Sequence, residues 1–306
     1  MSDPVVIKRL ASEFARRKPM RTTSLIVTVF GDVVSQHGGT LWLGSLVRAL
    51  APMGINERLV RTSVFRLVRE GWLEFERVGR RSYYRFSDYG SHEYHRAAVH
   101  IYALDGEPWY GRWQLLIPLA VPEEIRERFR RSLHWQGFRM ISAGTYAKPG
   151  SVDTDLQETL DEFDLADKVI LLEADTLPGT STELVREMVA ASWQLDAVAV
   201  HYREFLARFK PLAKWLGKNS APGPESAFVA RTLLIHDYRR VILQDTRMPL
   251  PLLPSRWPGS EAERLTAQVY RALAPASVDF ITAELEGDAG PMQAQDPSFA
   301  QRFGNH

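Results

Sequence analysis

The chain contains no cysteine among its 306 residues. A disulfide framework, an iron–sulfur cluster, a thiolate zinc site and a cysteine nucleophile are therefore excluded. Long apolar runs are also absent, because no stretch approaches the roughly 20 apolar residues that a membrane span needs. The first residues, MSDPVVIKRLASEFARRKPM, lack the apolar segment of a signal peptide. We therefore expect a cytoplasmic protein with no membrane partner.

Net charge is nearly absent, at +1, but the charges are unevenly distributed. Residues 1–100 hold 16 Lys and Arg against 9 Asp and Glu, whereas the remaining residues hold 22 against 28. A basic first third joined to an acidic remainder indicates that one part of the chain faces a polyanion. Chance clustering on solvated surfaces explains the charge distribution equally well. The positions of the basic residues must therefore distinguish a polyanion-binding surface from chance clustering.

Residues 1–21 end in a basic cluster and are predicted to be a mobile basic arm. Residues 22–88 read as a compact domain that begins with three helices: SLIVTVFGDVVSQHGG, TLWLGSLVRALAPMG and INERLVRTSVFRLVREGWL. The first of these is rich in β-branched residues and by propensity alone could form a strand. Its place before two clear helices favours a helix.

The third helix has a cationic side. Asn56 is a suitable N-cap, and Gly71 is a suitable stop. Apolar residues recur at helical spacing and form one face. The opposite side carries the following residues: Arg58, Arg61, Thr62, Arg66 and Arg69. A solvated helix usually alternates charge signs, so this one-signed side indicates a surface for a polyanion.

The next segment, WLEFERVGRRSYYRFSD, alternates apolar and polar residues on both sides of a Gly-containing turn, which predicts a β-hairpin. Arg80 and Arg81 lie at its tip. Three helices followed by a basic-tipped hairpin are the order of a winged helix-turn-helix, whose third helix enters the major groove while the wing meets phosphates. A small α+β domain with accidental basic residues is the alternative.

The rest of the chain predicts an α+β protein. A connecting helix is expected in residues 89–110, where His92 and His95 are more readily explained as solvated than as metal ligands. Residues 111–177 read strand–helix–strand–strand–helix–strand, the order of a ferredoxin-like domain, and are our candidate for homodimerisation. Residues 178–283 are expected to form an all-α effector domain, with a break at Lys210-Pro211, and 284–306 a disordered tail.

The sequence resembles the phenylacetate-degradation repressors, the PaaX family. The resemblance rests on long runs spread over the whole chain: GDVVSQHGGTLWLGSLVRAL, NERLVRTSVFRLVREGWL, RVGRRSYYRFSD, WQGF, LLIHDYRRVILQD, PLPLLPSRWPG and QRFG. It implies an N-terminal winged helix, a middle domain similar to the Cas2 proteins and a helical C-terminal domain. It also implies a homodimeric repressor of phenylacetate catabolic genes that binds double-stranded operator DNA in the nucleoid and is released by phenylacetyl-CoA.

The family logic points to six DNA-contact residues: Arg58, Arg61, Thr62, Arg66, Arg80 and Arg81. No cofactor is implied beyond the effector. A coenzyme A thioester needs cationic groups for its phosphates beside an apolar pocket for its acyl end. The densest basic group within an apolar helix of the second half is His236, Arg239 and Arg240, which we take as the hypothetical effector site. Buried ion pairs and solvated stems are the alternative.

Two other functions stay open at this point. A repressor of the same family could answer to another aryl- or acyl-CoA, because the pocket residues are unknown. A nucleic-acid-processing enzyme could be built on the Cas2-like domain, but the end of its first predicted strand reads Pro118-Leu119-Ala120 and offers no carboxylate for a magnesium ion. We therefore expect a binding protein and no enzyme.

Overall fold

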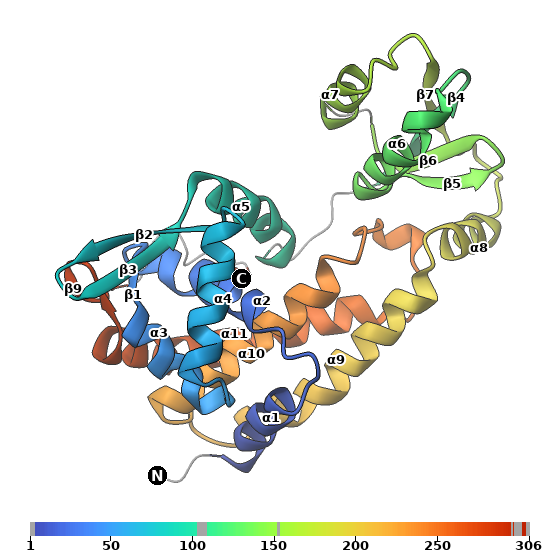
Figure 1. The fold of residues 1–306 in the computed structure, drawn as a ribbon. Helices are drawn as coiled ribbons and strands as arrows, with labels where there is room; N and C mark the ends of the chain where they lie inside the picture. The colour runs from blue at the N-terminus through green and yellow to red at the C-terminus, as the bar shows by residue number, and fades with distance from the viewer. Residues whose placement is uncertain (1–3, 103–108, 152–153, 295, 297–301, 304–306) are drawn as a thin grey trace. The chain divides into compact units, whose positions relative to one another are not determined.

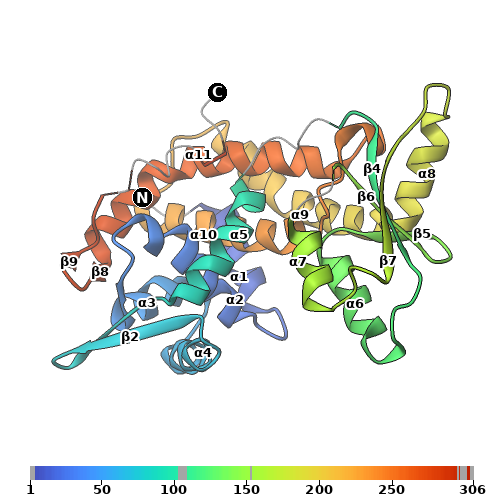
Figure 2. The ribbon, with the colours of Figure 1, turned by 90° about the horizontal axis from the view of Figure 1, so that it is seen from above.

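The computed structural model describes residues 4–102, 109–151, 154–294, 296 and 302–303. The chain forms two compact units: one comprises Met1–Leu104, His201–Leu243 and Pro258–His306, and the other Asp105–Val200 and Gln244–Trp257. The three predicted domains therefore correspond to two units, because the predicted effector domain is shared between them. Figures 1 and 2 show the elements of each unit.

The first unit begins with helices and a small sheet. The helices are α1 (Val5–Ala15), α2 (Thr22–Asp32), α3 (Leu43–Leu50) and α4 (Glu57–Arg69), with short 3-10 turns at Val34–Gln36 and Ala51–Met53. The strands are β1 (Leu41–Trp42), β2 (Leu73–Val78) and β3 (Arg81–Phe86), which pair antiparallel in the order β1-β3-β2. The predicted three helices and hairpin are thus confirmed.

The mobile arm predicted for residues 1–21 is wrong over residues 5–15. This segment forms α1, whose Ile7, Leu10 and Phe14 are buried. These three residues recur at helical spacing and form an apolar stripe that packs on α10. The prediction of a mobile arm depended on the basic residues after α1 and did not take this apolar stripe into account.

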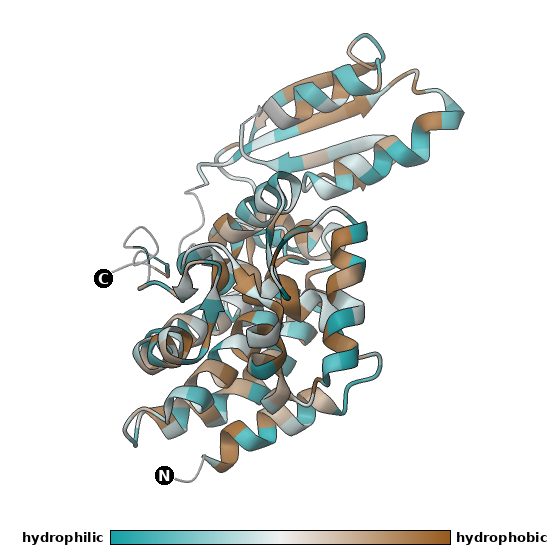
Figure 3. Ribbon diagram, turned by 60° about the vertical axis from the view of Figure 1, so that its left-hand side comes forward, coloured by the Kyte–Doolittle hydropathy of each residue, from teal (hydrophilic) through white to brown (hydrophobic). Residues whose placement is uncertain are grey.

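The later helices of the first unit complete its core. They are α5 (Asp88–Tyr102), α9 (Leu195–Leu216), α10 (Pro224–Ile242) and α11 (Pro258–Glu284), of which α9 begins in the other unit. In α10, 15 of 19 residues are buried, so this helix needs partners on all sides, and α1, α2, α5 and α11 provide them. Figure 3 shows hydrophobic and hydrophilic residues alternating along the helices.

Two expectations about the second half of the chain are corrected. The predicted break at Lys210-Pro211 is absent, because α9 continues through Pro211 to Leu216. The predicted disordered tail contains a hairpin of β8 (Glu286–Gly287) and β9 (Gly290–Pro291). This hairpin lies beside β1, and Met292 and Phe303 beyond it are buried. Residues 295, 297–301 and 304–306 of the tail lie outside the described residues.

The second unit has the predicted βαββαβ order. Its strands are β4 (Arg112–Pro118), β5 (Arg139–Ser142), β6 (Thr145–Pro149) and β7 (Val169–Asp175), and its helices are α6 (Glu123–Trp135), α7 (Thr154–Glu162) and α8 (Thr182–Ser192). The sheet is antiparallel, in the order β5-β6-β4-β7. Leu116 of β4 packs with Phe129 and Leu133 of α6 and with Leu156 and Leu160 of α7.

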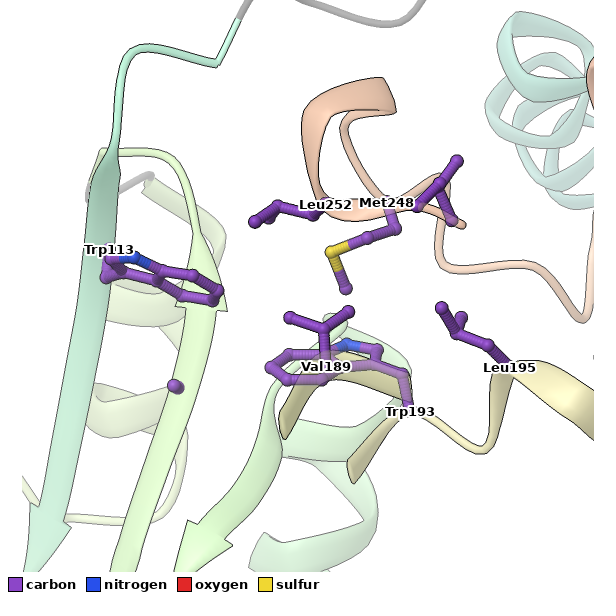
Figure 4. Close-up of a cluster of buried hydrophobic side chains, with 8 residues drawn as sticks. Trp113, Val189, Trp193, Leu195, Met248 and Leu252 are labelled. Atoms are coloured by element: carbon purple, nitrogen blue, oxygen red, sulfur yellow. The ribbon is translucent and has the colours of Figure 1, made fainter. Parts of the chain in front are cut away.

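A second apolar cluster fixes residues 178–200 and 244–257 to this sheet. Trp113 of β4 and Trp193 at the end of α8 lie with their ring centroids 6.3 Å apart. Met248 and Leu252 contribute to the same cluster, as Figure 4 shows. The indole N–H of Trp193 donates to the Gly137 carbonyl at 3.0 Å, so this buried polar group is satisfied.

Candidate nucleic-acid interface

Helix α4 is fixed at its start and along its inner side. The Asn56 side chain accepts a hydrogen bond from the Leu59 amide at 2.9 Å, as predicted for an N-cap. Val60, Val64 and Leu67 are each at most 1% exposed. The helix therefore has one orientation on the domain, and its other side must face outward.

The predicted cationic side of α4 is exposed in full. It contains the following residues: Arg58, Arg61, Thr62, Arg66 and Arg69. Arg61 pairs with Glu57 at 2.7 Å, and Arg66 pairs with Glu70 at 2.7 Å. Exposed pairs of this kind contribute only about 0.3–0.5 kcal/mol, so both arginines can exchange their carboxylate for a phosphate at little cost.

The exposed side of α4 also holds Phe65, which the sequence reading did not single out. Its side chain is 69% exposed. The apolar face predicted for this helix does not include Phe65, and the position of Phe65 on the helical wheel is the signal that could have placed it on the outer side. It lies among the arginines.

The hairpin of β2 and β3 presents its two tip arginines differently. Arg80 is exposed next to Gly79, whose φ of +61° allows the tight turn. Arg81 pairs with Glu286 of β8, and its guanidinium lies 4.3 Å from the centre of the Trp42 ring. Arg80 is thus free to meet a phosphate, whereas Arg81 must first leave a carboxylate.

The C-terminal hairpin adds further bonds to the same domain. Thr40 Oγ1 donates to Asp288 at 2.5 Å, and the Glu286 amide donates to Ser45 Oγ at 3.0 Å. The side chain of Arg48 on α3 donates to the Glu284 carbonyl at 3.0 Å. An acidic segment at and after the end of α11 therefore holds β1, α3 and the β2–β3 hairpin together.

His236, from the hypothetical effector site, lies in the core. It is 1% exposed and lies against the Phe14 ring at 5.6 Å and near the Thr28 hydroxyl at 3.4 Å. Burial lowers its pKa to about 3, so the ring is neutral at physiological pH. A direct contact between His236 and a ligand is therefore not available in this arrangement.

Arg239 and Arg240 are partly buried on the same helix. Arg239 donates to the Ser24 carbonyl at 3.3 Å. The Nε atoms of both side chains are buried without a hydrogen-bond partner. Burial lowers the pKa of Arg240, and Arg21 and Arg17 lower it further. The two arginines thus retain unused donors in an electropositive region.

One acid balances the arginines near the start of α2. Asp237 is 3% exposed and accepts two bonds from Arg17, at 2.6 and 2.7 Å, and one from Arg208 at 2.6 Å. Burial would raise the pKa of Asp237, but these arginines lower it below its ordinary value. Because three N–H groups already share the carboxylate of Asp237, it has little capacity left for Arg240.

A buried ionic network connects α2, α5, α10 and α11, and no local pattern of residues predicts it. Arg231 donates to the Asp32 carboxylate at 2.9 Å and to the Tyr270 hydroxyl at 2.8 Å. Arg302 and the Tyr102 hydroxyl donate to the same carboxylate at 2.9 and 2.7 Å. Burial would raise the pKa of Asp32, but Arg231 and Arg302 hold it below its ordinary value.

A shallow cleft of about 360 Å³ lies between α1, the turn before α4 and the start of α10. Its walls are largely apolar, with Ile7, Pro52 and Val229, and Lys8 and Glu225 are its two charged lining residues. His236, Arg239 and Arg240 are not among its lining residues. The cleft and the predicted effector residues are therefore separate features of the first unit.

The described residues contain no candidate for a metal site or for a membrane-spanning helix. No group of three His, Asp or Glu side chains there could hold a metal ion, and this includes the neighbourhood of His92 and His95. Each described helix is too short or too polar to cross a bilayer.

The fold and the exposed arginines define an α+β chain with a basic surface helix ahead of a Cas2-like sheet domain. Three family models match it: PaaX-like protein over residues 21–90, the PaaX protein central Cas2-like domain over 106–185 and the PaaX-like protein C-terminal domain over 193–283. The chain is 38% identical to the transcriptional repressor PaaX of Escherichia coli (strain K12), over 94% of this chain and 91% of that one. The chain belongs to the PaaX family.

A solved structure shares the fold. The uncharacterized protein Rv0674 from Mycobacterium tuberculosis superposes with a TM-score of 0.56 at 22% identity, covering 83% of this chain and 95% of that chain. At this identity the likeness concerns the fold alone. Because the match covers 83% of this chain, it includes residues of both compact units.

Proposed function

We propose that the chain is a transcriptional repressor that binds operator DNA through a winged helix-turn-helix in residues 22–88. The observation that carries this proposal is the outer side of α4, where four arginines and Thr62 are exposed next to a hairpin whose tip is basic. A helix with this side free fits the major groove, and Arg80 of the wing then reaches phosphates. Arg58, Arg61, Thr62, Arg66 and Arg81 supply the further contacts.

The regulated genes are proposed from the relative. Its name, transcriptional repressor PaaX, and the family resemblance support phenylacetate catabolic genes as the target and phenylacetyl-CoA as the effector that releases the protein. Another aryl- or acyl-CoA is the alternative effector. Such a repressor would act in the cytoplasm, on the DNA of the nucleoid, and would bind rather than catalyse.

We assign homodimerisation to the central sheet. β7 is an edge strand of this sheet, and its Ile170 and Leu172 are 41% and 44% exposed. An edge strand with apolar side chains is a template for pairing with a second chain. Two copies joined here would present two α4 helices to two half-sites of an operator.

The effector is proposed to bind its phosphates at Arg240, with Arg239 beside it. The support is the unused donors of these side chains in an arginine-rich region, because Arg groups bind phosphate with two parallel bonds. His236 supports this site only as packing between α10, α1 and α2, which revises its predicted role as a ligand contact.

Helix packing offers a route from this site to DNA. α10 packs on α2, and α2 packs on α4, so a ligand that favours another position of α10 also favours another position of the DNA-binding helix. Linkage then requires that operator DNA weaken effector binding by the same factor. Equal effector affinity with and without operator would contradict this coupling.

The test is an electrophoretic shift on the DNA directly upstream of the chain's own gene, titrated with phenylacetyl-CoA, other acyl-CoA thioesters and free coenzyme A. We expect binding without ligand and release by one thioester. An Arg240→Glu variant should bind the DNA as before and resist release. Arg264→Glu on α11, whose side chain is also exposed, is the matched control and should be released normally.

A further inference from the structure

Phe65 lies at the centre of the exposed arginine side of α4. An α-helix turns by about 100° per residue, so Arg58, Thr62 and Arg69 project within about 60° of Phe65. The buried residues Val60, Val64 and Leu67 project to the opposite side. The ring is 69% exposed and therefore contributes little to the core.

Exposure of a single apolar side chain is common and indicates nothing by itself. Phe65 is distinguished from other exposed apolar residues by its charged neighbours on the helix face, which are all arginines. Arg61 and Arg66 at the flanks are paired with Glu57 and Glu70, whereas Arg58 and Arg69 form no ion pair with any described residue. The ring is thus framed by cations that fit a polyanion.

The base edges in the major groove offer one apolar group, the C5-methyl of thymine, and Phe is among the side chains that contact it. The other groups there are hydrogen-bond donors and acceptors, which a phenyl ring cannot satisfy. When α4 enters a groove with its arginines on phosphates and guanines, the central ring must meet a base edge. A methyl group is the partner that avoids an unsatisfied polar atom.

We propose that Phe65 is a specificity-determining residue that reads the C5-methyl group of thymine in each half-site. This inference rests on the proposed function of the chain as a DNA-binding repressor. The residue selects thymine over cytosine, because cytosine carries hydrogen at C5, and it adds an apolar contact to a surface whose other contacts are electrostatic. Thr62 donates its hydroxyl to the Arg58 carbonyl at 2.8 Å, which leaves its methyl group to extend the same apolar contact.

The experiment removes the methyl group from the DNA and the ring from the protein. Duplexes bound by the full chain are first selected from a random pool. Each thymine of the selected site is then replaced by uracil, which keeps the base pair and removes the methyl. Affinity is measured for the unchanged protein, for Phe65→Ala and for Trp135→Ala, a control with an 85% exposed ring in the other unit.

We expect uracil at one thymine of each half-site to weaken binding of the unchanged protein by about fourfold, the effect of losing one buried methylene-sized group. Phe65→Ala should bind the thymine site about tenfold more weakly and should not distinguish uracil from thymine there. The salt dependence of Phe65→Ala should be unchanged, because no phosphate contact is lost. Trp135→Ala should behave like the unchanged protein.

Three results separate the possible failures. If no uracil replacement weakens binding of the unchanged protein, Phe65 reads no methyl and the inference falls while the repressor function stands. If Phe65→Ala keeps the same sensitivity to uracil, another residue reads the methyl, and the inference falls again. If the unchanged protein selects no DNA, the proposed function itself is overturned.

Discussion

Helices α4 and α10 are both rich in arginine, but they use the residue in opposite ways. The four arginines of α4 are exposed, and two of them have only a neighbouring glutamate on their own helix as a partner. On α10, Arg231 is 0% exposed and is bonded to Asp32 and Tyr270. Helix α10 has partners on nearly every side, whereas α4 packs with one side only.

The comparison shows that an arginine-rich helix presents a continuous basic surface only when its apolar residues occupy one side. On α4 the apolar residues recur at helical spacing and leave a free side. On α10 the apolar residues lie on all sides, so Arg231 and His236 are enclosed, whereas Arg239 and Arg240 near its end are partly buried. Four experiments test this difference between the two helices.

The substitution Arg231→Met is expected to have the largest effect, a loss of free energy of unfolding. This change leaves the buried Asp32 carboxylate with fewer partners, and breaking a buried pair on one side costs about 3–5 kcal/mol. Urea unfolding measures the loss. Arg69→Met on α4 is the control and should change stability by less than about 0.5 kcal/mol. If Arg231→Met and Arg69→Met lost the same free energy of unfolding, the arginines of α10 and α4 would not differ in structural role.

Substitutions of the exposed arginines on α4 should change DNA affinity rather than stability. Arg58→Ala combined with Arg66→Ala is expected to weaken operator binding by about 100-fold, because base and phosphate contacts are lost together. The slope of log affinity against log salt should fall by about 0.9 for each phosphate contact removed. Arg264→Ala is the control. Unaltered operator affinity of the double variant would overturn the repressor proposal.

His236 should make folding sensitive to acid. In the unfolded chain it binds a proton below about pH 6.5, but in the folded chain burial lowers its pKa to about 3. Protons therefore favour the unfolded state, and stability is lost as pH falls below 6.5. Unfolding free energy should drop by about 2 kcal/mol between pH 7.5 and pH 5. His236→Gln should remove this part of the drop, and the exposed His201→Gln should not.

The smallest effect is expected from Glu286→Gln. This change releases Arg81 from its partner, and the two side chains are only half-buried, at 48% and 33% exposed. The freed guanidinium can bind a phosphate, so DNA affinity should rise about two- to fivefold, with a steeper salt dependence. Glu74→Gln on β2, which frees Arg85, is the control. A loss of affinity would show that the pair holds the wing in place.

The sequence predicted the local elements well where periodicity and turn residues were clear. The βαββαβ order of the second unit, the N-cap at Asn56 and the interruption around Trp193 are all confirmed. Helix α2 was ambiguous because its β-branched residues favour strands. Nine of its 11 residues are buried, and packing on all sides decides its state.

The failures are all in long-range packing. Arg17 meets Asp237 and Arg302 meets Asp32 across more than 200 residues, and no local pattern indicates such pairs. The same limit explains why residues 5–15 were predicted to be mobile, why the hairpin in the tail was not predicted and why His236 was predicted to contact the effector. Pro211 is a further case: a proline is expected to interrupt a helix, but α9 continues through it, and Phe209 and Leu212 beside it are buried.

The amino-acid sequence alone determined the helix and strand order and the cationic side of α4, because periodicity, capping and turn residues act over a few positions. Tertiary structure alone decided which arginines face solvent, which are enclosed, and that residues from both ends of the chain share one core. The physical reason is burial: a charged side chain becomes a binding group or a structural one according to the atoms that distant segments place around it.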